Sequence, residues 1–358
     1  MTRYLRDILR QPDELQKTLE YLSGAGRQTL NQAATLLRKA RHVYLTGIGS
    51  SWNAAMAAAA LFNAGGRPVH LYDAAELLHF ATFPPDSLVV AISRTGRSVE
   101  IVQLLSKVRE SGATLIGVTN AAEGPLAQQA RVSLIIPVVF DHGISVNTYS
   151  TLVCAAGALA TATVSSFDAA LASRLSRAVQ ACNPAIPAWR EQIARSDWLA
   201  PGSTYYFLAR GSSLGSCHEA RLLWEEGAKS AATAMSTSSF RHGPQEIVSL
   251  GLRFGIWIDG QRMRSQDWAV ARDLKQLGGC VMLIGQRLAE GTADLALDLP
   301  AIPEAWQFLI DVIPAQLAAE HLAEISGVDC DSFRYCSYIV ETEYGLMNDK
   351  VVVPKEGS

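Results

Sequence analysis

The sequence predicts an α/β protein made of two tandem three-layer αβα units, each with a mainly five-stranded parallel sheet. Short apolar segments alternate along the chain with segments of helical periodicity, which is the pattern of βαβ units. The predicted strands of the first half recur in the second half at an offset of about 160 to 166 residues. Of the 358 residues, 49% are apolar and the formal net charge is only −3, so the chain can bury two sizeable cores.

The first unit is predicted at residues 41–165, after two N-terminal helices in residues 1–40. Leucines recur at helical spacing in those helices, and Gly24-Ala25-Gly26 marks the break between them. Apolar segments predict strands at 42–47, 67–72, 88–92, 113–119 and 132–137. Helical patterns are found at 52–63, from Val99 onward and at 148–163.

The second unit is predicted at residues 201–330. It follows a helical connector at 166–200, which Asn183-Pro184 and Ile186-Pro187 are expected to interrupt. The predicted strands of the second unit are 203–210, 252–258, 280–284 and 295–299, and a helix at 305–325 closes it. Residues 331–358 are predicted to form a C-terminal tail.

Composition excludes several classes of protein. The nearly balanced charge argues against a nucleic-acid-binding surface, and the apolar stretches at 54–64 and 152–164 are too short to cross a membrane. The six cysteines form no C-x-x-C pair and no cluster with zinc spacing, and His218-Glu219 lacks the second histidine of a metalloprotease helix. Since no secretory signal opens the chain, we expect a soluble, cytoplasmic protein without a metal or a cofactor.

The stretch Ser93-Arg94-Thr95-Gly96-Arg97-Ser98 has the composition of a phosphate-binding loop. It lies between the predicted strand 88–92 and a helix that starts near Val99, so it is placed at the carboxyl end of a parallel strand. There the backbone N–H groups and the helix dipole favour an anion, and three hydroxyl groups can donate to phosphate oxygens. Gly96 allows the backbone to approach closely. An ordinary helix start capped by Ser98 would also explain part of this pattern.

The corresponding loop of the second unit has a different composition. The strand at 252–258 is followed by Asp259-Gly260-Gln261-Arg262, which has one possible capping side chain and no run of hydroxyl groups. A helix cap alone would not require the first loop to be so much richer in hydroxyl groups. We therefore expect the first unit to hold a phosphate and the second unit to contribute other groups.

Three motifs together resemble the tandem sugar-isomerase (SIS) domain proteins. They are the turn at 47–51, the hydroxyl loop at 93–98, and the segment that runs from Glu226 to Phe240-Arg241-His242-Gly243-Pro244. Similar proteins include the isomerase half of glucosamine-6-phosphate synthase and related phosphosugar deaminases and deglycases. The resemblance covers nearly the whole chain after residue 40 and implies that both units are of the SIS type.

The resemblance implies a role for each residue that falls on a motif position. Glu226 falls on the carboxylate that moves a proton between C1 and C2 of the open-chain sugar. His242 falls on a histidine that opens the sugar ring in the neighbouring subunit's site, which implies a homodimer. The C-terminal tail would close over the site. The residues that the resemblance assigns to sugar-phosphate binding are Ser51, Ser93, Arg94 through its backbone, Thr95, Ser98, Thr148 and Arg334.

The sequence departs from the synthase pattern at three points. No nucleophilic cysteine follows Met1, so glutamine-dependent amination is not expected. Arg94 replaces an uncharged amide side chain and would add a cation beside the phosphate. Tyr338 stands where the family has a ring-opening lysine, and spacing gives no support for Lys350 or Lys355 as its substitute.

Helix geometry distinguishes Glu226 from the adjacent Glu225. Leu222 and Leu223 precede Glu226 by four and three residues, so Glu226 is expected to face the interior. Glu225 is expected to pair with Arg221 at the surface. A buried carboxyl group whose pKa is raised toward neutrality can remove a proton next to a carbonyl group, so Glu226 is the candidate base.

The expected activity is aldose–ketose isomerisation of a hexose or hexosamine 6-phosphate. Deamination of an aminosugar phosphate, or deglycation of a fructosamine phosphate, is the alternative because the same base and enediol-type intermediate serve these reactions. A non-catalytic phosphosugar sensor would need the phosphate loop but neither Glu226 nor His242. Each of three residues also has a purely structural interpretation. Glu226 would form an ion pair, His242 would donate a hydrogen bond to a backbone carbonyl group, and Arg334 would be an ordinary surface residue.

Overall fold

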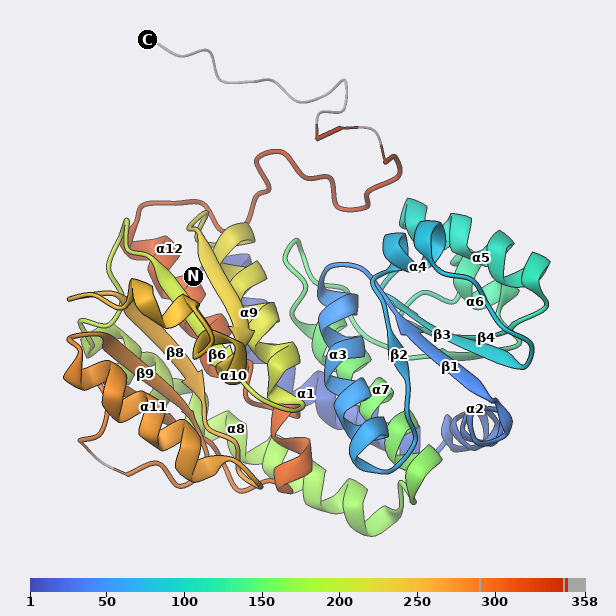
Figure 1. The fold of residues 1–358 in the computed structure, drawn as a ribbon, viewed down its shortest axis with the longest axis horizontal. Coiled ribbons are helices and arrows are strands. Elements are labelled where there is room, and N and C mark those ends of the chain that lie inside the picture. The colour runs from blue at the N-terminus through green and yellow to red at the C-terminus, as the bar shows by residue number, and fades with distance from the viewer. Residues whose placement is uncertain (290, 344, 347–358) are drawn as a thin grey trace.

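The computed structural model contains two α/β units whose all-parallel sheets share one strand order (Figure 1). The structure describes residues 1–289, 291–343, 345 and 346. The first sheet has the order β2-β1-β3-β4-β5 and the second has the order β7-β6-β8-β9-β10. The strands are β1 (His42–Thr46), β2 (His70–Leu71), β3 (Ser87–Ser93), β4 (Thr114–Thr119), β5 (Val132–Ile135), β6 (Tyr205–Ala209), β7 (Ala232–Ser236), β8 (Arg253–Trp257), β9 (Cys280–Gly285) and β10 (Leu295–Asp298).

Helices cover the faces of both sheets. In the first half these are α1 (Arg3–Ser23), α2 (Arg27–Lys39), α3 (Ser50–Ala64), α4 (Ala74–Phe80), α5 (Val99–Ser111), α6 (Pro125–Gln129) and α7 (Asn147–Val164). The connector and the second half contain α8 (Ala169–Arg195), α9 (Ser213–Glu226), α10 (Thr237–Phe240), η1 (Pro244–Ile247), α11 (Arg264–Gln276), η2 (Glu304–Leu309) and α12 (Ile313–Ile325). The predicted fold class, with two five-stranded parallel sheets, is thereby confirmed.

The strand order places a crevice in each unit. In the first sheet, β2 is added on one side of β1, and the later strands are added on the other side, beginning with β3. The same reversal occurs between β6 and β8 in the second unit. In open parallel sheets the loops at such a reversal separate, so ligands bind at the carboxyl ends of those strands. The hydroxyl loop at 94–98 follows β3 and the turn at 47–49 follows β1, so both lie at the crevice of the first unit.

The two units meet along α3 and α9, which lie side by side at the centre of the molecule (Figure 1). The helices run antiparallel: Ser50, at the start of α3, donates to Glu219 at the middle of α9 over 3.0 Å, while Gly215, nearer the start of α9, lies against Ala57, further along α3. Gly215 makes the contact close, since a Cβ atom there would lie 2.5 Å from the carbonyl oxygen of Asn53. Each helix therefore extends from one unit toward the crevice of the other.

The connector differs from the prediction. Helix α8 continues through Pro184 and Pro187, so the expected interruptions are wrong. Both prolines lie on the exposed face, where carbonyl groups that lose a helical partner can bond to water. The opposite face is buried at Cys182, Ile186 and Trp189, and this packing stabilises the helix across the missing hydrogen bonds.

Other differences concern short elements. The structure contains β7, α4, α6 and α10, for which the apolar pattern gave no signal, and β2 has only two residues. The predicted helix at 305–325 is divided into η2 and α12. Within the described residues, no helix is both long and apolar enough to cross a bilayer.

Candidate active site

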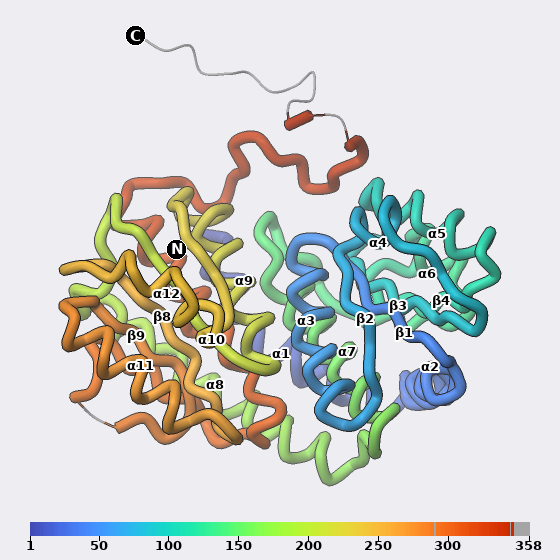
Figure 2. The backbone as a smooth tube through the Cα atoms, in the orientation of Figure 1, coloured from blue at the N-terminus to red at the C-terminus, as the bar shows by residue number. Residues whose placement is uncertain are grey.

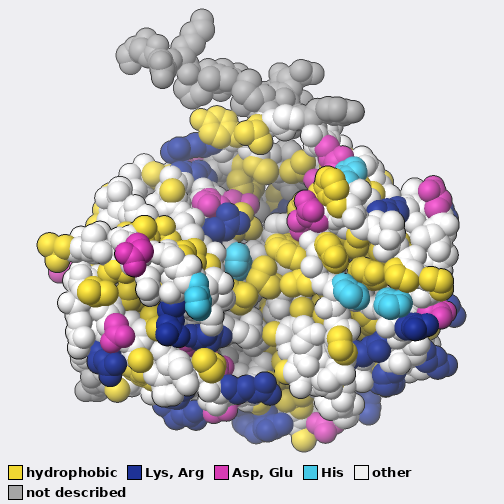
Figure 3. All heavy atoms as spheres, viewed as in Figure 1, with side chains coloured by type: hydrophobic (Ala, Val, Ile, Leu, Met, Phe, Trp, Pro, Cys, Tyr) yellow, Lys and Arg dark blue, Asp and Glu magenta, His cyan; other side chains and the backbone are white. Residues whose placement is uncertain are grey.

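A cavity of about 240 Å³ lies at the crevice of the first unit. The space-filling view shows the surface hollowed between the two units, below the C-terminal segment (Figure 3). Its walls are formed by the turn after β1, the loop after β3, the end of α9, and Phe333 and residues 336–340 of the C-terminal segment. The predicted site residues among its lining are Ser51, Ser93, Arg94, Thr95, Ser98 and Glu226.

The hydroxyl loop is folded on its own backbone. Ser93 Oγ accepts from the N–H of Gly96 over 3.0 Å, and Thr95 Oγ1 accepts from the N–H of Arg97 over 3.3 Å. A hydroxyl group that accepts in this way still has its proton to donate to a ligand. Gly96 has φ +65°, and a Cβ atom there would lie 2.8 Å from the Cβ of Leu126, so both backbone and space require glycine.

Ser98 occupies the N-cap position of α5, but its side chain makes no capping hydrogen bond. The hydroxyl group therefore does not serve the helix start, which the alternative interpretation of this loop would require. Ser98 lines the cavity instead, together with Ser51 in the first turn of α3. The N-terminal ends of α3 and α5 both lie at this cavity, and neither has a side-chain cap. At the start of α3 the N–H groups of residues 51–53 already donate to backbone carbonyl groups, whereas those of Glu100 and Ile101 in α5 have no partner among the described residues and can face an anion.

Glu226 reaches the same cavity from the second unit. It is the last residue of α9 and is partly buried. Burial raises the pKa of its carboxyl group to about 7, although Arg94 and Lys229 act in the opposite direction. Glu225 pairs with Arg221 over 2.9 Å at the surface, which confirms the predicted difference between the two neighbouring glutamates. The cavity thus combines a hydroxyl-lined loop with a carboxyl group that titrates near neutral pH.

The C-terminal segment covers the cavity through Arg94. The tube view shows this segment passing above both units (Figure 2). The guanidinium group of Arg94 lies 3.9 Å from the ring centroid of Tyr338 and donates to the Tyr338 carbonyl over 2.7 Å. It also donates to Ser145 Oγ over 3.0 Å, and the N–H of Val99 donates to Val340 over 3.0 Å. Arg94 therefore anchors the segment with its side chain, while its backbone belongs to the hydroxyl loop.

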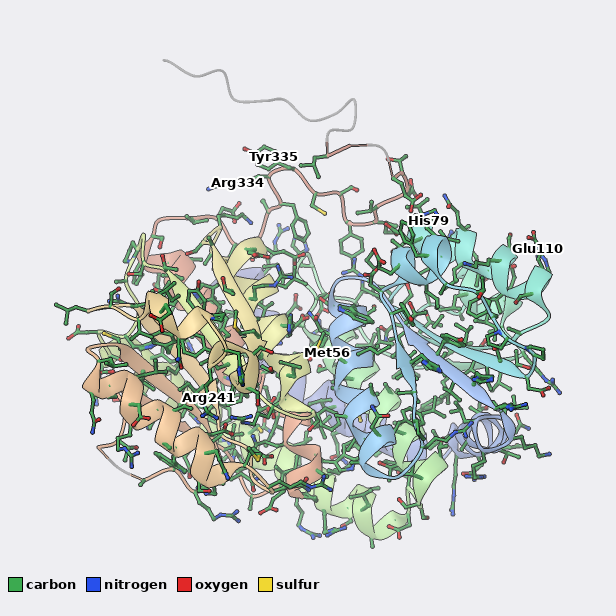
Figure 4. The ribbon with its side chains drawn as sticks, viewed as in Figure 1. Met56, His79, Glu110, Arg241, Arg334 and Tyr335 are labelled. Carbon is green, nitrogen blue, oxygen red and sulfur yellow. The ribbon has the colours of Figure 1, made fainter. Side chains whose placement is uncertain are left out.

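Arg334 lies on the same segment but outside the first cavity. Figure 4 places it with Tyr335 at the outer edge of the segment, and it lines a neighbouring cavity that also contains Glu226 and Lys229. Lys229 Nζ donates to the Ser332 carbonyl over 2.8 Å and to the Glu226 carbonyl. Burial, followed by the charge of Arg334, lowers the pKa of the Lys229 amine. Lys350 and Lys355 lie outside the described residues.

Two predicted residues lie away from the cavity in this chain. Thr148 is fully buried at the start of α7, and its hydroxyl group donates to Asp141 over 2.6 Å, so it is committed to the protein interior. His242 is exposed on the second unit. It is not among the described residues that line the cavity. Figure 4 shows the preceding residue, Arg241, on the second unit.

Sequence reasoning missed Glu219. This residue is fully buried on α9, on the same helical face as Glu226. Its carboxylate accepts hydrogen bonds from Ser50 over 3.0 Å and from Asn53 over 2.7 Å. Burial raises the pKa of its carboxyl group to about 8, although the hydrogen bond from Asn53 lowers it. The seven-residue spacing between Glu219 and Glu226 places both carboxyl groups toward α3 and could have revealed the pair. Within the described residues, no group of three or more potential ligands could hold a metal ion.

Residues 36–162 match the family model described as "SIS domain", which places a SIS domain in the first α/β unit. The match does not extend to the second unit, although that unit repeats the strand order. The chain is homologous to glutamine–fructose-6-phosphate aminotransferases: it is 25% identical over 351 residues to the isomerizing enzyme of Pyrobaculum aerophilum. That alignment covers 95% of this chain but only 57% of the relative, so the chain spans little more than half of the curated relatives' length.

Solved structures share this fold. The C-terminal domain of glucosamine-fructose-6-phosphate aminotransferase from Francisella tularensis superposes with a TM-score of 0.82 at 20% identity, covering 92% of this chain and 98% of that one. Glucosamine-6-phosphate deaminase from Thermotoga maritima gives a TM-score of 0.80 at 21% identity, with coverage of 95% and 99%. Tagatose-6-phosphate ketose/aldose isomerase from Escherichia coli gives a TM-score of 0.77 at 20% identity, and the superposition covers 92% of this chain and 95% of that one. At these identities the likeness establishes the architecture of both units.

Proposed function

We propose that this protein is a phosphosugar isomerase that interconverts the aldose and ketose forms of a hexose or hexosamine 6-phosphate, with Glu226 as its base. The observation that carries the proposal is the position of Glu226: it comes from the second unit and lines the cavity of the hydroxyl loop. The homology to isomerizing aminotransferases supports the substrate class. In this account the second unit is also of the SIS type.

The cavity suits the two ends of such a substrate. The phosphate would be held by Ser93, Thr95 and Ser98 at the uncapped start of α5. The other end of the open-chain sugar would then face Glu226. With a pKa of about 7, Glu226 can take the proton from the carbon next to the carbonyl group and return it to the neighbouring carbon. Both halves of that transfer need the group to change protonation state near neutral pH.

His242 of a second copy would assist ring opening, as the resemblance implies, which makes the proposed enzyme a homodimer. The imidazole of His242 is exposed, so it is accessible to a ligand held by another chain, and an imidazole can both accept and donate a proton. Arg334 and Thr148 are proposed to contact ligand only after a rearrangement, because neither lines the cavity in this state. Ser51 lines it directly.

A second candidate is deamination of an aminosugar phosphate or deglycation of a fructosamine phosphate. The observation that favours it is the cavity wall at Tyr338: no lysine is found among the described residues that line the cavity. A site lined as the described residues line it has no amine to form a Schiff base, which the synthase route requires. The base at Glu226 would serve C–N bond cleavage equally well.

The test is a substrate panel combined with a pair of adjacent substitutions. The wild-type protein is incubated in D₂O with hexose, hexosamine and fructosamine 6-phosphates, and mass spectrometry follows isomer formation, deuterium at C1 or C2, and release of ammonia or amino acid. Glu226→Gln is expected to bind the same compound but to lose turnover, while Glu225→Gln keeps it. Turnover retained by Glu226→Gln would remove this residue from the mechanism, and binding without turnover of any compound would indicate a sensor.

A further inference from the structure

A second cavity, of about 440 Å³, lies at the crevice of the second unit. Its walls are the loop after β6, the loop after β8, the C-terminal end of α3 and the η2 segment. These are the counterparts of the walls of the first cavity, because β6 and β8 occupy the positions of β1 and β3 in the repeated strand order. The two cavities therefore lie at opposite ends of the antiparallel pair α3–α9 (Figure 1).

The loops of the second cavity repeat the backbone arrangement of the first. Gly49-Ser50-Ser51 after β1 corresponds to Gly211-Ser212-Ser213 after β6, and both glycines have positive φ, +57° and +56°. Ser93 is the last residue of β3, and Asp259 lies two residues after the end of β8. The Asp259 carboxylate accepts from the backbone N–H groups of Arg262 and Met263, each over 2.7 Å. Ser93 accepts in the same way from the residue three positions ahead.

The side chains of this second cavity provide guanidinium groups in place of hydroxyl groups. Arg210 has only 11% of its side chain exposed. Its Nε donates to Asp267 over 2.6 Å and its Nη1 donates to Ser238, but its buried Nη2 has no partner among the described residues. Arg262 is exposed and forms no salt bridge with any described residue. The carboxylate of Asp259 is engaged by backbone, and that of Glu304 by Arg287 over 2.9 Å. The charged groups that remain free on the walls are thus cationic, beside neutral polar side chains such as Ser212 and Gln261.

Helix ends add to this positive potential. The start of α9 has no side-chain cap; the N–H groups of Leu214 and Gly215 donate to the carbonyl groups of the preceding loop, and the N–H of Ser213 remains for a ligand. Guanidinium groups recognise phosphate oxygens by paired hydrogen bonds, and they do so most strongly where water is excluded. Phosphate monoesters therefore fit the combination of a largely buried arginine, an exposed arginine and a helix start without a side-chain cap better than neutral ligands do.

We infer that the second unit binds a second phosphorylated small molecule, of the sugar-phosphate class, at this cavity. Binding there occurs without turnover. In the first cavity the end of α9 provides Glu226, whereas in the second cavity the corresponding wall is the end of α3, which provides Ala60, Leu61, Asn63 and Ala64. This inference is independent of which reaction the first cavity performs.

The experiment counts bound ligand per chain. Phosphorus NMR and calorimetry follow titration of the full-length Glu226→Gln protein, which does not consume the ligand, with fructose 6-phosphate, glucosamine 6-phosphate and inorganic phosphate. Two bound equivalents per chain are expected for at least one sugar phosphate. If inorganic phosphate binds at the second cavity as fully as the sugar phosphates do, the site recognises the phosphate group alone. That result would still support a phosphate-binding site.

Two substitutions assign the second equivalent. Arg262→Ser removes an exposed cation, and Ala60→Phe fills the cavity from the partly exposed face of α3; each is expected to reduce binding to one equivalent. Ser98→Ala, in the first cavity, is the matched control and should weaken the other equivalent by about tenfold, as expected for one lost hydrogen bond to a charged group. A single equivalent in the unsubstituted chain, or two equivalents untouched by Arg262→Ser, would overturn the inference. A thermal melt of each variant distinguishes lost binding from lost folding.

Discussion

Replacing Glu226 with glutamine is expected to stabilise the protein at alkaline pH while it removes the proposed activity. Below the ordinary pKa of 4.5, the carboxyl group is protonated in both the folded and the unfolded chain, so burial costs nothing. As pH rises from there to about 7, the unfolded chain loses its proton and the folded chain keeps it, so stability falls. Above about 7 the full cost of a buried carboxylate is present, and glutamine avoids it.

The size of this effect follows from the raised pKa. A tenfold change in proton affinity is worth about 1.4 kcal/mol, so a rise of the pKa from 4.5 to about 7 sets an upper limit of about 3–4 kcal/mol. Because the side chain is partly exposed, solvent screening reduces this to on the order of 1–2 kcal/mol. The gain should be present at pH 8 and nearly absent at pH 5.

Urea unfolding of the wild-type, Glu226→Gln and Glu225→Gln proteins at pH 5 and pH 8 measures this difference. The Glu225→Gln control breaks an exposed pair with Arg221 and should lower the free energy of unfolding by roughly 0.5 kcal/mol or less at both values of pH. If Glu226→Gln is no more stable than wild type at pH 8, then burial does not hold the pKa of this carboxyl group near 7, and the argument for a poised base fails.

Three further outcomes follow from the geometry of the loop and of the interface between the units. Gly96→Ala places a Cβ atom 2.8 Å from that of Leu126 at φ +65°, so we expect it to cost about 1–2 kcal/mol of stability and to weaken phosphate binding by calorimetry. Arg94→Ala removes a cation that lowers the pKa of Glu226, so the pH–rate profile should shift to higher pH. Gly215→Ala puts a Cβ atom 2.5 Å from a backbone oxygen of α3, and should lower the free energy of unfolding by about 1–3 kcal/mol.

Each of these outcomes has a control in the chain. Gly112 has φ +72° but open space around it, so Gly112→Ala shares the backbone cost of Gly96→Ala and should leave phosphate binding unchanged. Arg97 belongs to the same loop, but its guanidinium group donates to the Glu123 carbonyl at the surface. Arg97→Ala should therefore not move the pH–rate profile. Equal effects of Arg94→Ala and Arg97→Ala would show that loop charge in general, and not proximity to Glu226, sets its pKa. A Gly215→Ala protein as stable as wild type would mean that α3 and α9 can separate without cost.

The fold was largely readable from the sequence because its signals are local. The apolar run that became β3 and the hydroxyl loop that follows it are contiguous, and their pattern fixes both the strand and the crevice at its end. Helical spacing correctly separated Glu225 from Glu226 for the same reason. The prolines of α8 were misjudged because packing on its buried face, which is a tertiary property, outweighs two missing hydrogen bonds.

Features that depend on contacts between distant residues were not readable. Arg94 and Tyr338 are 244 positions apart, and nothing in either segment indicates that one anchors the other. The commitment of Thr148 to Asp141 depends on how the loop before α7 folds back, so its hydroxyl group seemed as available as that of Ser98. The second cavity is visible only when the repeated strand order is combined with the unpartnered nitrogen of Arg210.

The most direct measurement is a crystal structure of the Glu226→Gln protein soaked with fructose 6-phosphate. Our account predicts that phosphate oxygens lie within hydrogen-bond distance of Ser93, Thr95 and Ser98, and that C1 and C2 of the same molecule face residue 226. A sugar phosphate whose carbons point away from residue 226 while its phosphate occupies the loop, or a loop left unoccupied at saturation, would contradict it.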